Sequence, residues 1–389
     1  MLNTMRKCLF FVIHILFVSL FLYGCETEKS TGTHRVVANP LNLNYINNNV
    51  MRKLLNSLVA LFILVLLSSC NNTPKKSTEP KEDDFDRLHK NPFITHMYTA
   101  DPSAHVWADG RLYVYASHDN APSRGCDFMD KYHVFSTDDM VNWTDHGQIL
   151  EAKDVPWGGG IANGGTFMWA PDCAYKNGKY YFYFPHPSGP EWNNSWKIGI
   201  AVSDKPASDF VCLDHWLIGL PDQGEIDPCV FVDDDGQAYF YYGGGGKSYG
   251  AKLKDNMIEL DGELQLMEGL EDFHEATWIH KKNGIYYLSY SDNHDDNWND
   301  GVKGDNRLRY AISDNPLGPW EHKGIYMEPT NSYTNHGSIV EYKGQWYAFY
   351  HNSDLSEKNG EFNDWLRSAC VDKLYYNEDG TIQMVKQTK

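Results

Sequence analysis

The sequence predicts an all-β fold, a five-bladed β-propeller with four antiparallel strands per blade. One pattern carries most of this prediction: a glycine at a hairpin-like turn is followed, always three residues later, by a tyrosine within a short aromatic run. The glycines are spaced 68, 58, 48 and 60 residues apart, at Gly110, Gly178, Gly236, Gly284 and Gly344. Asn-Gly or Asp-Gly before a strand-like run indicates a tight hairpin, and a hairpin repeated at such intervals is typical of propeller blades.

A second strand-like run follows each hairpin and supports the count of five. Each run closes on an aspartate that suits the start of a turn, and the copy in the third repeat is the weakest. The runs lie at residues 134–138, 200–204, 251–255, 310–314 and 368–372. A β-sandwich with aromatic strands is the alternative, but such a fold has no reason to repeat one residue at one offset five times.

The N-terminal part of the chain reads as targeting sequence. Residues 51–70 combine a basic start, an apolar stretch and the box Leu67-Ser68-Ser69-Cys70, which predicts a lipoprotein signal peptide with lipid attached at Cys70. The stretch is shorter than the roughly 20 apolar residues that a spanning helix needs, so a permanent anchor helix is the lesser alternative. Residues 5–25 repeat the pattern and end at Cys25. Because two export signals in series make little physical sense, we interpret residues 1–50 as an upstream translation artefact, with tandem anchoring as the alternative.

The remainder divides into a tether and one domain. Residues 71–87 are polar and are expected to form a flexible linker, and residues 88–389 are expected to form the propeller. The predicted location is therefore the bacterial cell envelope, outer membrane or periplasm, with the protein held by its lipid and acting as a monomer. A net charge of −18 argues against nucleic acid as a partner. The cysteines of the propeller region are scattered without a CxxC pair, so neither a zinc site nor a disulfide framework is expected.

Polar residues occur at similar distances before each repeated glycine, where the innermost strand of a blade should line the central channel. Asp101, Asp227 and Glu275 each lie nine residues before their glycine, His336 lies eight before, and Asp172 only six. Similar offsets predict similar heights, so these side chains should form a ring at one mouth of the channel. Carboxyl groups this close cannot all ionise easily, and at least one pKa should be raised. A pair of carboxyls, one acid and one base, is what glycosidic bond cleavage needs.

Several short motifs, in order, give the chain a resemblance to glycoside hydrolase family 43, the five-bladed propellers that cleave arabinose- and xylose-containing polysaccharides. The resemblance covers residues from about 92 to 385. It is carried by Ala100-Asp101-Pro102-Ser103, Trp169-Ala170-Pro171-Asp172, Ile226-Asp227-Pro228, His274-Glu275-Ala276 and Asn335-His336-Gly337-Ser338, among others.

The resemblance implies a role for each member of the ring. Asp101 is implied as general base, Glu275 as general acid, and Asp227 as the residue that raises the pKa of the acid and orients it. His336 matches a central histidine that would orient water around a calcium ion, the one metal expected and not a required cofactor. Arg367 matches an arginine that reaches the sugar.

Further side chains near the acids are candidates for binding the substrate. The candidates are Asp172, which could instead be structural, His274, and three tryptophans that could wall the sugar pocket: Trp107, Trp169 and Trp278.

The resulting prediction is an inverting, exo-acting hydrolase that releases arabinofuranose or xylose from plant cell-wall polysaccharide. Insertions at residues 154–165 and 294–306 could wall off a pocket, which favours exo action. The alternatives are an endo-acting arabinanase or xylanase and a non-catalytic carbohydrate-binding lipoprotein. A binding protein would not need all three of Asp101, Asp227 and Glu275. The sequence does not decide between arabinose and xylose.

Overall fold

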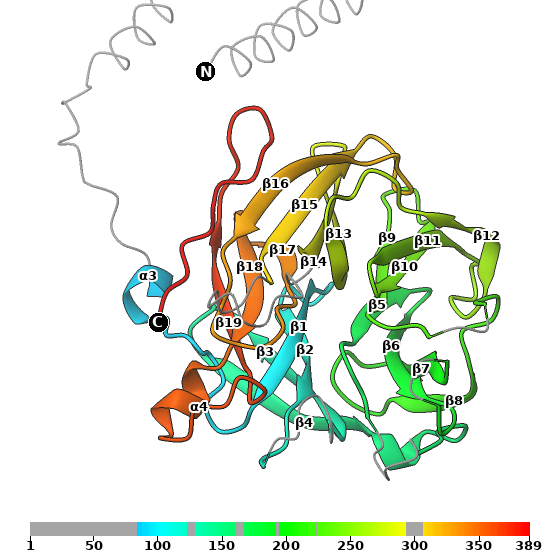
Figure 1. Cartoon of the computed structure of the whole chain (residues 1–389), viewed down its shortest axis with the longest axis horizontal. Helices are drawn as coiled ribbons and strands as arrows, with labels where there is room; N and C mark the ends of the chain where they lie inside the picture. Colours follow the sequence, from blue (N-terminus) through cyan, green and yellow to red (C-terminus); the bar gives the residue numbers. More distant parts are fainter. Residues whose placement is uncertain (1–83, 123–128, 161–166, 192–193, 222–223, 293–305) are drawn as a thin grey trace, which may run out of the picture. The chain divides into compact units, whose positions relative to one another are not determined.

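In a computed structural model, the described residues are 84–122, 129–160, 167–191, 194–221, 224–292 and 306–389. They all belong to the unit Pro80–Lys389. This part of the chain forms five antiparallel sheets that follow one another around a central axis, which is a five-bladed β-propeller (Figure 1). The predicted fold class is therefore confirmed.

Each blade is a meander of consecutive strands, the first of which is innermost. Blade one contains β1 (Thr99–Val106), β2 (Leu112–His118), β3 (Lys131–Thr137) and β4 (Trp143–Glu151). Blade two contains β5 (Asp172–Lys176), β6 (Lys179–Pro187), β7 (Trp196–Ser203) and β8 (Val211–Trp216). Blade three contains β9 (Cys229–Val232), β10 (Ala238–Gly244), β11 (Lys247–Leu253) and β12 (Leu260–Leu266). Blade four contains β13 (Phe273–Lys282), β14 (Ile285–Asp292), β15 (Leu308–Ser313) and β16 (Glu321–Met327).

Blade five differs from the predicted four strands, because it has three: β17 (Ser338–Tyr342), β18 (Gln345–Asn352) and β19 (Ser368–Leu374). The chain before β1 lies along the outer edge of β19 instead, where Phe93 N donates to Ala369 O at 3.1 Å. Thr99 N likewise donates to Arg367 O at 2.9 Å. These bonds join the first and last parts of the propeller and close the ring.

Three short helical elements accompany the sheets: α3 (Asp84–Leu88), η2 (Ala152–Asp154) and α4 (Asp354–Lys358). Helix α3 corrects the predicted linker, because residues 84–87 are folded onto blade five. Phe85 is buried with its ring 5.3 Å from that of Tyr347, and Asp86 pairs with Lys373 at 2.7 Å. The folded domain therefore begins by Asp84. The predicted signals with Cys25 and Cys70, and the linker before residue 84, lie outside the described residues.

The five repeated glycines all occupy the hairpin between the first two strands of a blade, as the pattern predicted. Their φ angles lie between 80° and 84°, in the left-handed region that glycine reaches without a Cβ clash. The tyrosine three residues later is buried in every blade. The second strand-like runs fall on or at the end of β3, β7, β11, β15 and β19.

Tyrosines also join neighbouring blades through one recurring contact. Tyr115, Tyr183 and Tyr241 donate their hydroxyls to backbone carbonyls of the next blade, at Pro206 (2.6 Å), Met257 (2.8 Å) and Pro316 (2.6 Å). In each case the acceptor lies in the turn between the third and fourth strands. These tyrosines of the aromatic runs after the hairpins thus fill the core with their rings, while their hydroxyls find hydrogen-bond acceptors in the next blade.

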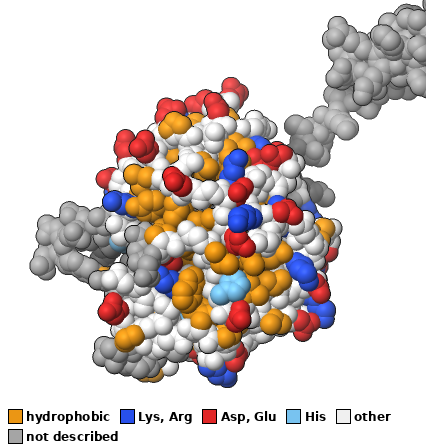
Figure 2. All heavy atoms as spheres, turned by 90° about the vertical axis from the view of Figure 1, so that its right-hand side faces the viewer, with side chains coloured by type: hydrophobic (Ala, Val, Ile, Leu, Met, Phe, Trp, Pro, Cys, Tyr) orange, Lys and Arg blue, Asp and Glu red, His pale blue; other side chains and the backbone are white. Residues whose placement is uncertain are grey.

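The outer strands β8 and β12 carry several exposed apolar side chains, among them Val211, Trp216 and Leu266. Figure 2 shows this side of the propeller, with apolar side chains interspersed with acidic and basic ones. Among the described residues, no helix is both long and apolar enough to cross a membrane.

Candidate active site

A pocket of about 180 Å³ opens where the five innermost strands begin. Each blade contributes at least one side chain to it, because all five strands run in the same direction along the channel. The polar lining groups are Asp101, Asp227, His274, Glu275, Tyr333, Thr334, His336 and Arg367, and the others include Met129, Trp169, Ile226 and Trp365. Four of the five members of the predicted ring therefore meet here.

Asp172, the fifth member, lies below the pocket. Its offset from the hairpin glycine is three residues shorter than that of Asp101, which corresponds to about 10 Å along a strand. Asp172 is 1 % exposed, and its carboxylate accepts bonds from Ser103 Oγ (2.7 Å) and Val230 N (2.6 Å) and contacts His105 Nε2 (2.7 Å). It joins blades one to three and is not placed to touch a sugar in the pocket. The residue at the matching offset in blade two is Trp169, which does line the pocket.

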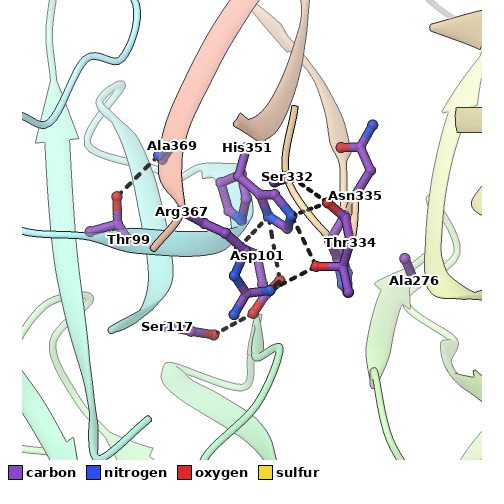
Figure 3. Close-up of polar contacts among 12 residues, drawn as sticks. Thr99, Asp101, Ser117, Ala276, Ser332, Thr334, Asn335, His351, Arg367 and Ala369 are labelled. Carbon is purple, nitrogen blue, oxygen red and sulfur yellow. Dashed lines mark hydrogen bonds and ion pairs between the residues drawn. The ribbon is translucent and has the colours of Figure 1, made fainter. Parts of the chain in front are cut away.

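The carboxylate of Asp101 is held on both oxygens (Figure 3). Oδ1 lies 3.1 Å from Nη1 of Arg367, and Oδ2 accepts a bond from Ser117 Oγ at 2.8 Å. Burial acts to raise the pKa of Asp101, but the positive charge of Arg367 leads the opposing contributions and the pKa falls below its ordinary value. Asp101 is therefore ionised at neutral pH, as a general base must be.

His351 supports the backbone of Asp101. Its Nδ1 accepts a bond from Asp101 N at 3.1 Å, and its Nε2 lies 2.8 Å from Thr334 O. Burial lowers the pKa of His351 to about 3. The ring is thus neutral, with its proton on Nε2 facing the carbonyl.

Asp119 fixes Arg367. Its Oδ1 accepts a bond from Nη2 at 2.8 Å, and its Oδ2 accepts from Nε at 2.9 Å and from the backbone N at 2.8 Å. Arg367 Nη1 also donates to Thr334 Oγ1 at 2.9 Å, on the side of the guanidinium that faces Asp101. Asp119, Ser117 and His351 were not predicted, because none of them lies at the offset of the channel ring.

Asp227 is the carboxyl whose pKa is driven upward, as the ring predicted for at least one member. Burial raises it most, and the negative charges of Glu275 and Asp101 add to the rise, so its pKa lies well above the ordinary value. Oδ2 of Asp227 accepts a bond from Ala276 N at 2.9 Å. Asp227 therefore fixes the backbone immediately after Glu275.

Glu275 is the most accessible of the three carboxyls. Its side chain is 21 % exposed, against 6 % for Asp101 and 7 % for Asp227. His274 Nε2 lies 3.7 Å from Glu275 Oε2 at the open side of the pocket. Glu275 is thus positioned to meet an entering molecule.

The backbone is strained at these residues. Asp101, Asp227 and Ala276 have φ angles of 52°, 55° and 66°, a region that residues with a Cβ seldom occupy. The register of β1 with β2 shifts next to Asp101, and that of β13 with β14 shifts on either side of Glu275. Such strain and irregular pairing concentrate at functional sites, where they redirect side chains.

A family model described as Glycosyl hydrolases family 43 matches residues 89–382, which include every lining residue of this pocket. The chain belongs to glycosyl hydrolase family 43. It is therefore a glycoside hydrolase, and the matched residues agree with the extent that the resemblance predicted.

Named relatives of this family 43 enzyme agree with one another. Xylosidase/arabinosidase 43A of Humicola insolens is 37 % identical, over 75 % of this chain and 98 % of its own. A xylosidase/arabinosidase of Bacteroides ovatus is 36 % identical, over 76 % of this chain and 97 % of its own. A solved family 43 β-xylosidase/α-arabinofuranosidase from a compost microbial metagenome, in complex with xylotriose and in calcium-free form, has a TM-score of 0.65 and 36 % identity, covering 76 % of this chain and 97 % of its own.

Two of the tryptophans predicted to wall the sugar pocket lie elsewhere in the family 43 fold. Trp107 and Trp278 line a different cavity, together with Ala104 and Ile339. The physical reason is their place in the sequence: each lies further along the chain than the ring residue of its blade, on or just after the innermost strand, and so closer to the far mouth. Trp365 and Tyr333, which were not predicted, line the pocket instead, with stacked rings whose centroids are 3.9 Å apart.

A calcium ion near His336 was the one metal expected. Among the described residues, no group of three or more His, Cys, Asp or Glu side chains could hold a metal ion. Nδ1 of His336 lies 4.0 Å from Asp227 Oδ2, and burial lowers the pKa of His336, so its ring is neutral. These side chains do not fit an ion that the protein ligates directly, and no catalytic step below uses one.

Proposed function

We propose that this family 43 enzyme is an exo-acting, inverting glycosidase that releases xylose or arabinofuranose from arabinoxylan-type chains. The observation that carries the proposal is the pocket itself, in which a base, an acid and an orienting carboxyl line about 180 Å³. A volume this small suits one sugar residue at the end of a chain better than the middle of a polymer. The names of the relatives, which combine xylosidase and arabinosidase, support the same substrate class.

The base acts on water. Asp101 stays ionised because Arg367 faces Oδ1 and Ser117 bonds Oδ2. It takes a proton from a water molecule, whose oxygen forms a bond to the anomeric carbon.

The acid acts on the leaving group. Glu275, the accessible carboxyl, gives its proton to the glycosidic oxygen as the bond between that oxygen and the anomeric carbon breaks. Asp227 holds Glu275 in place through the bond to Ala276 N at 2.9 Å. One displacement inverts the anomeric configuration, and it requires carboxyls roughly 6.5–9.5 Å apart, with room for water.

The test is hydrolysis of the nitrophenyl glycosides of β-xylose and α-arabinofuranose, measured side by side. We expect release of nitrophenol from at least one of them, and losses on the order of 10²–10⁴-fold in Asp101→Asn and Glu275→Gln. Proton NMR of the first-formed sugar should show the opposite anomer to that of the substrate. A retained anomer would refute the single displacement, and fragments of mixed length from polymeric xylan or arabinan would favour endo action.

A further inference from the structure

A second and larger cavity opens at the other end of the central channel. Its volume is about 620 Å³, against about 180 Å³ for the catalytic pocket. Its walls come from the far ends of the same innermost strands, including Val106, Val232 and Lys281 at or near the ends of β1, β9 and β13. As the described residues line them, the two cavities share no residue. Figure 1 shows these strands side by side around the axis.

Buried groups separate the two cavities. Asp172, Cys173 and Cys229 are at most 2 % exposed, and the bonds of Asp172 to Ser103 and Val230 join blade two to blades one and three below the catalytic pocket. Trp278, 5 % exposed, donates from Nε1 to Ile339 O at 3.0 Å and joins blades four and five. A molecule in the far cavity therefore does not reach the catalytic carboxyls.

An aromatic wall lines one side of the far cavity. Trp107 stacks on His105 with ring centroids 4.9 Å apart and planes within 7°, and its Nε1 donates to Tyr115 OH at 3.1 Å. Tyr175, on the neighbouring blade, is 40 % exposed, and its ring lies 6.4 Å from that of Trp107. These contacts fix the rings before any ligand arrives, which reduces the entropy lost on binding.

Polar groups line the opposite side. Lys281 Nζ pairs with Asp233 at 2.6 Å and with Asp234 at 2.9 Å, and the exposed Glu341 comes from blade five. The two aspartates balance the positive charge of Lys281, and the net charge of this side of the cavity is negative. An anionic ligand such as a phosphate ester is therefore excluded. Hydroxyl groups can donate to these carboxylates and accept from the lysine.

A largely apolar cavity of roughly 300–1,000 Å³ with a few fixed polar groups is typical of a binding site for a small molecule. A sugar chain combines an apolar C–H face with a rim of hydroxyls, and so matches an aromatic wall that faces carboxylates. We propose that the far cavity is a second, non-catalytic binding site for a neutral pentose oligosaccharide. The identity of the sugar rests on the proposed function. A chain held there would keep the enzyme on its polymer between cleavage events.

The test uses Tyr175, whose exposure makes its removal tolerable to the fold. In a Glu275→Gln background, Tyr175→Ala should weaken retention on native gels containing soluble arabinoxylan at least several-fold, whereas Tyr175→Phe should keep it. Tyr375→Ala is the matched control, since Tyr375 is 51 % exposed but does not line the cavity. Melting temperatures establish that each variant is folded.

Activity separates the two sites. In the otherwise unaltered enzyme, Tyr175→Ala should leave kcat/KM on the nitrophenyl glycoside unchanged and lower the rate on polymeric arabinoxylan. Equal retention of the Tyr175→Ala and Tyr375→Ala variants in arabinoxylan gels would overturn the proposal. So would a loss of retention by Tyr175→Ala in hydroxyethyl cellulose gels as large as its loss in arabinoxylan gels. Failure of the proposed function would appear differently, as absent glycoside hydrolysis in the unaltered chain.

Discussion

Arg367 pairs with Asp101, the proposed general base, through Nη1 and Oδ1 at 3.1 Å. Asp119 holds Arg367 in this position with three hydrogen bonds, two to the guanidinium and one to the backbone N. The guanidinium of Arg367 thus lies between the carboxylates of Asp119 and Asp101, and all three side chains are buried. Because the planar guanidinium is fixed along one edge by Asp119, its remaining edge is aimed at Asp101 and Thr334.

Asp119→Asn should therefore lower activity although Asp119 does not line the pocket. An amide cannot accept on both sides, so Arg367 loses its alignment, and displacement of a catalytic group by about 1 Å costs on the order of 10²-fold in rate. We expect kcat on the nitrophenyl glycoside to fall by that order. Asp130→Asn is a suitable control, since Asp130 pairs with His118 at 2.9 Å outside the pocket. An unchanged kcat in a folded Asp119→Asn protein would show that Asp119 does not position Arg367 for catalysis.

Ser117→Ala should shift the pH profile and not merely the rate. The variant removes the hydroxyl that donates to Asp101 Oδ2 at 2.8 Å, and so raises the pKa of a base that is ordinarily held low. The acid limb of kcat/KM should move to higher pH, because the ionised form of Asp101 loses a hydrogen bond that stabilises it. Ser353→Ala is the matched control, because Ser353 is equally buried and its Oγ has no partner among the described residues. An acid limb at the same pH in both variants would contradict this assignment.

Repetition explains why so much of the fold was predictable from the sequence. A positive φ at the same hairpin position requires glycine in each blade, and the buried tyrosine three residues later follows from strand alternation. The meeting of Asp101, Asp227 and Glu275 at one pocket was predictable for the same reason, since equal offsets give equal heights. The predicted place of Asp172 in the ring was wrong, because an offset three residues shorter carries it out of the pocket.

The missed residues have no such periodic signal. Ser117 and Asp119 lie near or after the end of β2, and the pairing of β2 with β1 brings them to Asp101. Trp365 lies in the chain before β19, and the closed ring brings it to the pocket. Trp107 and Trp278 were misplaced because proximity in sequence to an acid does not fix which mouth of the channel a side chain faces. The missing fourth strand of blade five has a similar cause, since its place is taken by a segment far earlier in the chain. Val371 N, for example, donates to Oδ1 of Asn91, 280 positions earlier.

Lipid attachment at Cys70 remains a prediction of the sequence. Mass spectrometry of protein from the membrane fraction should find a diacylated cysteine at position 70 as the mature N-terminus, and Cys70→Ser should release the enzyme from that fraction. The matched change Cys25→Ser should have no effect if translation begins at Met51. A mature N-terminus at Cys25, or an intact segment across residues 60–75, would contradict the prediction.

Calcium at His336 also remains a prediction, with water carrying the coordination. Addition of excess chelator should lower the melting temperature or the activity, and added Ca²⁺ should restore it. His336→Gln should lose this sensitivity, since it removes the ring that would orient the water of such an ion. If kinetics and melting are the same with and without chelator, the metal has no part in this enzyme.

Asp227→Asn should stabilise the enzyme while disabling it. The folded-state pKa of Asp227 lies well above its unfolded value near 3.8, because of burial and the charges of Glu275 and Asp101. The folded protein therefore holds a proton that the unfolded chain releases, so the contribution of this group to stability is present below about pH 4 and is lost as the pH rises through the folded pKa. Asparagine does not titrate, and its carbonyl can still accept the bond from Ala276 N.

The gain in Tm of Asp227→Asn over the unaltered enzyme should thus be small at pH 4 and grow toward pH 7. A relief of about 1 kcal/mol corresponds to roughly 2–4 °C for a domain of this order of size. Asp261→Asn, at an exposed position of β12, should show no such trend. Activity should fall, because an amide, unlike the carboxyl of Asp227 that lines the pocket, cannot ionise opposite the positive charge that develops on the sugar ring in the transition state. A melting temperature that falls at pH 7 would mean that the charge of Asp227 stabilises the fold, contrary to its burial beside two other carboxyls.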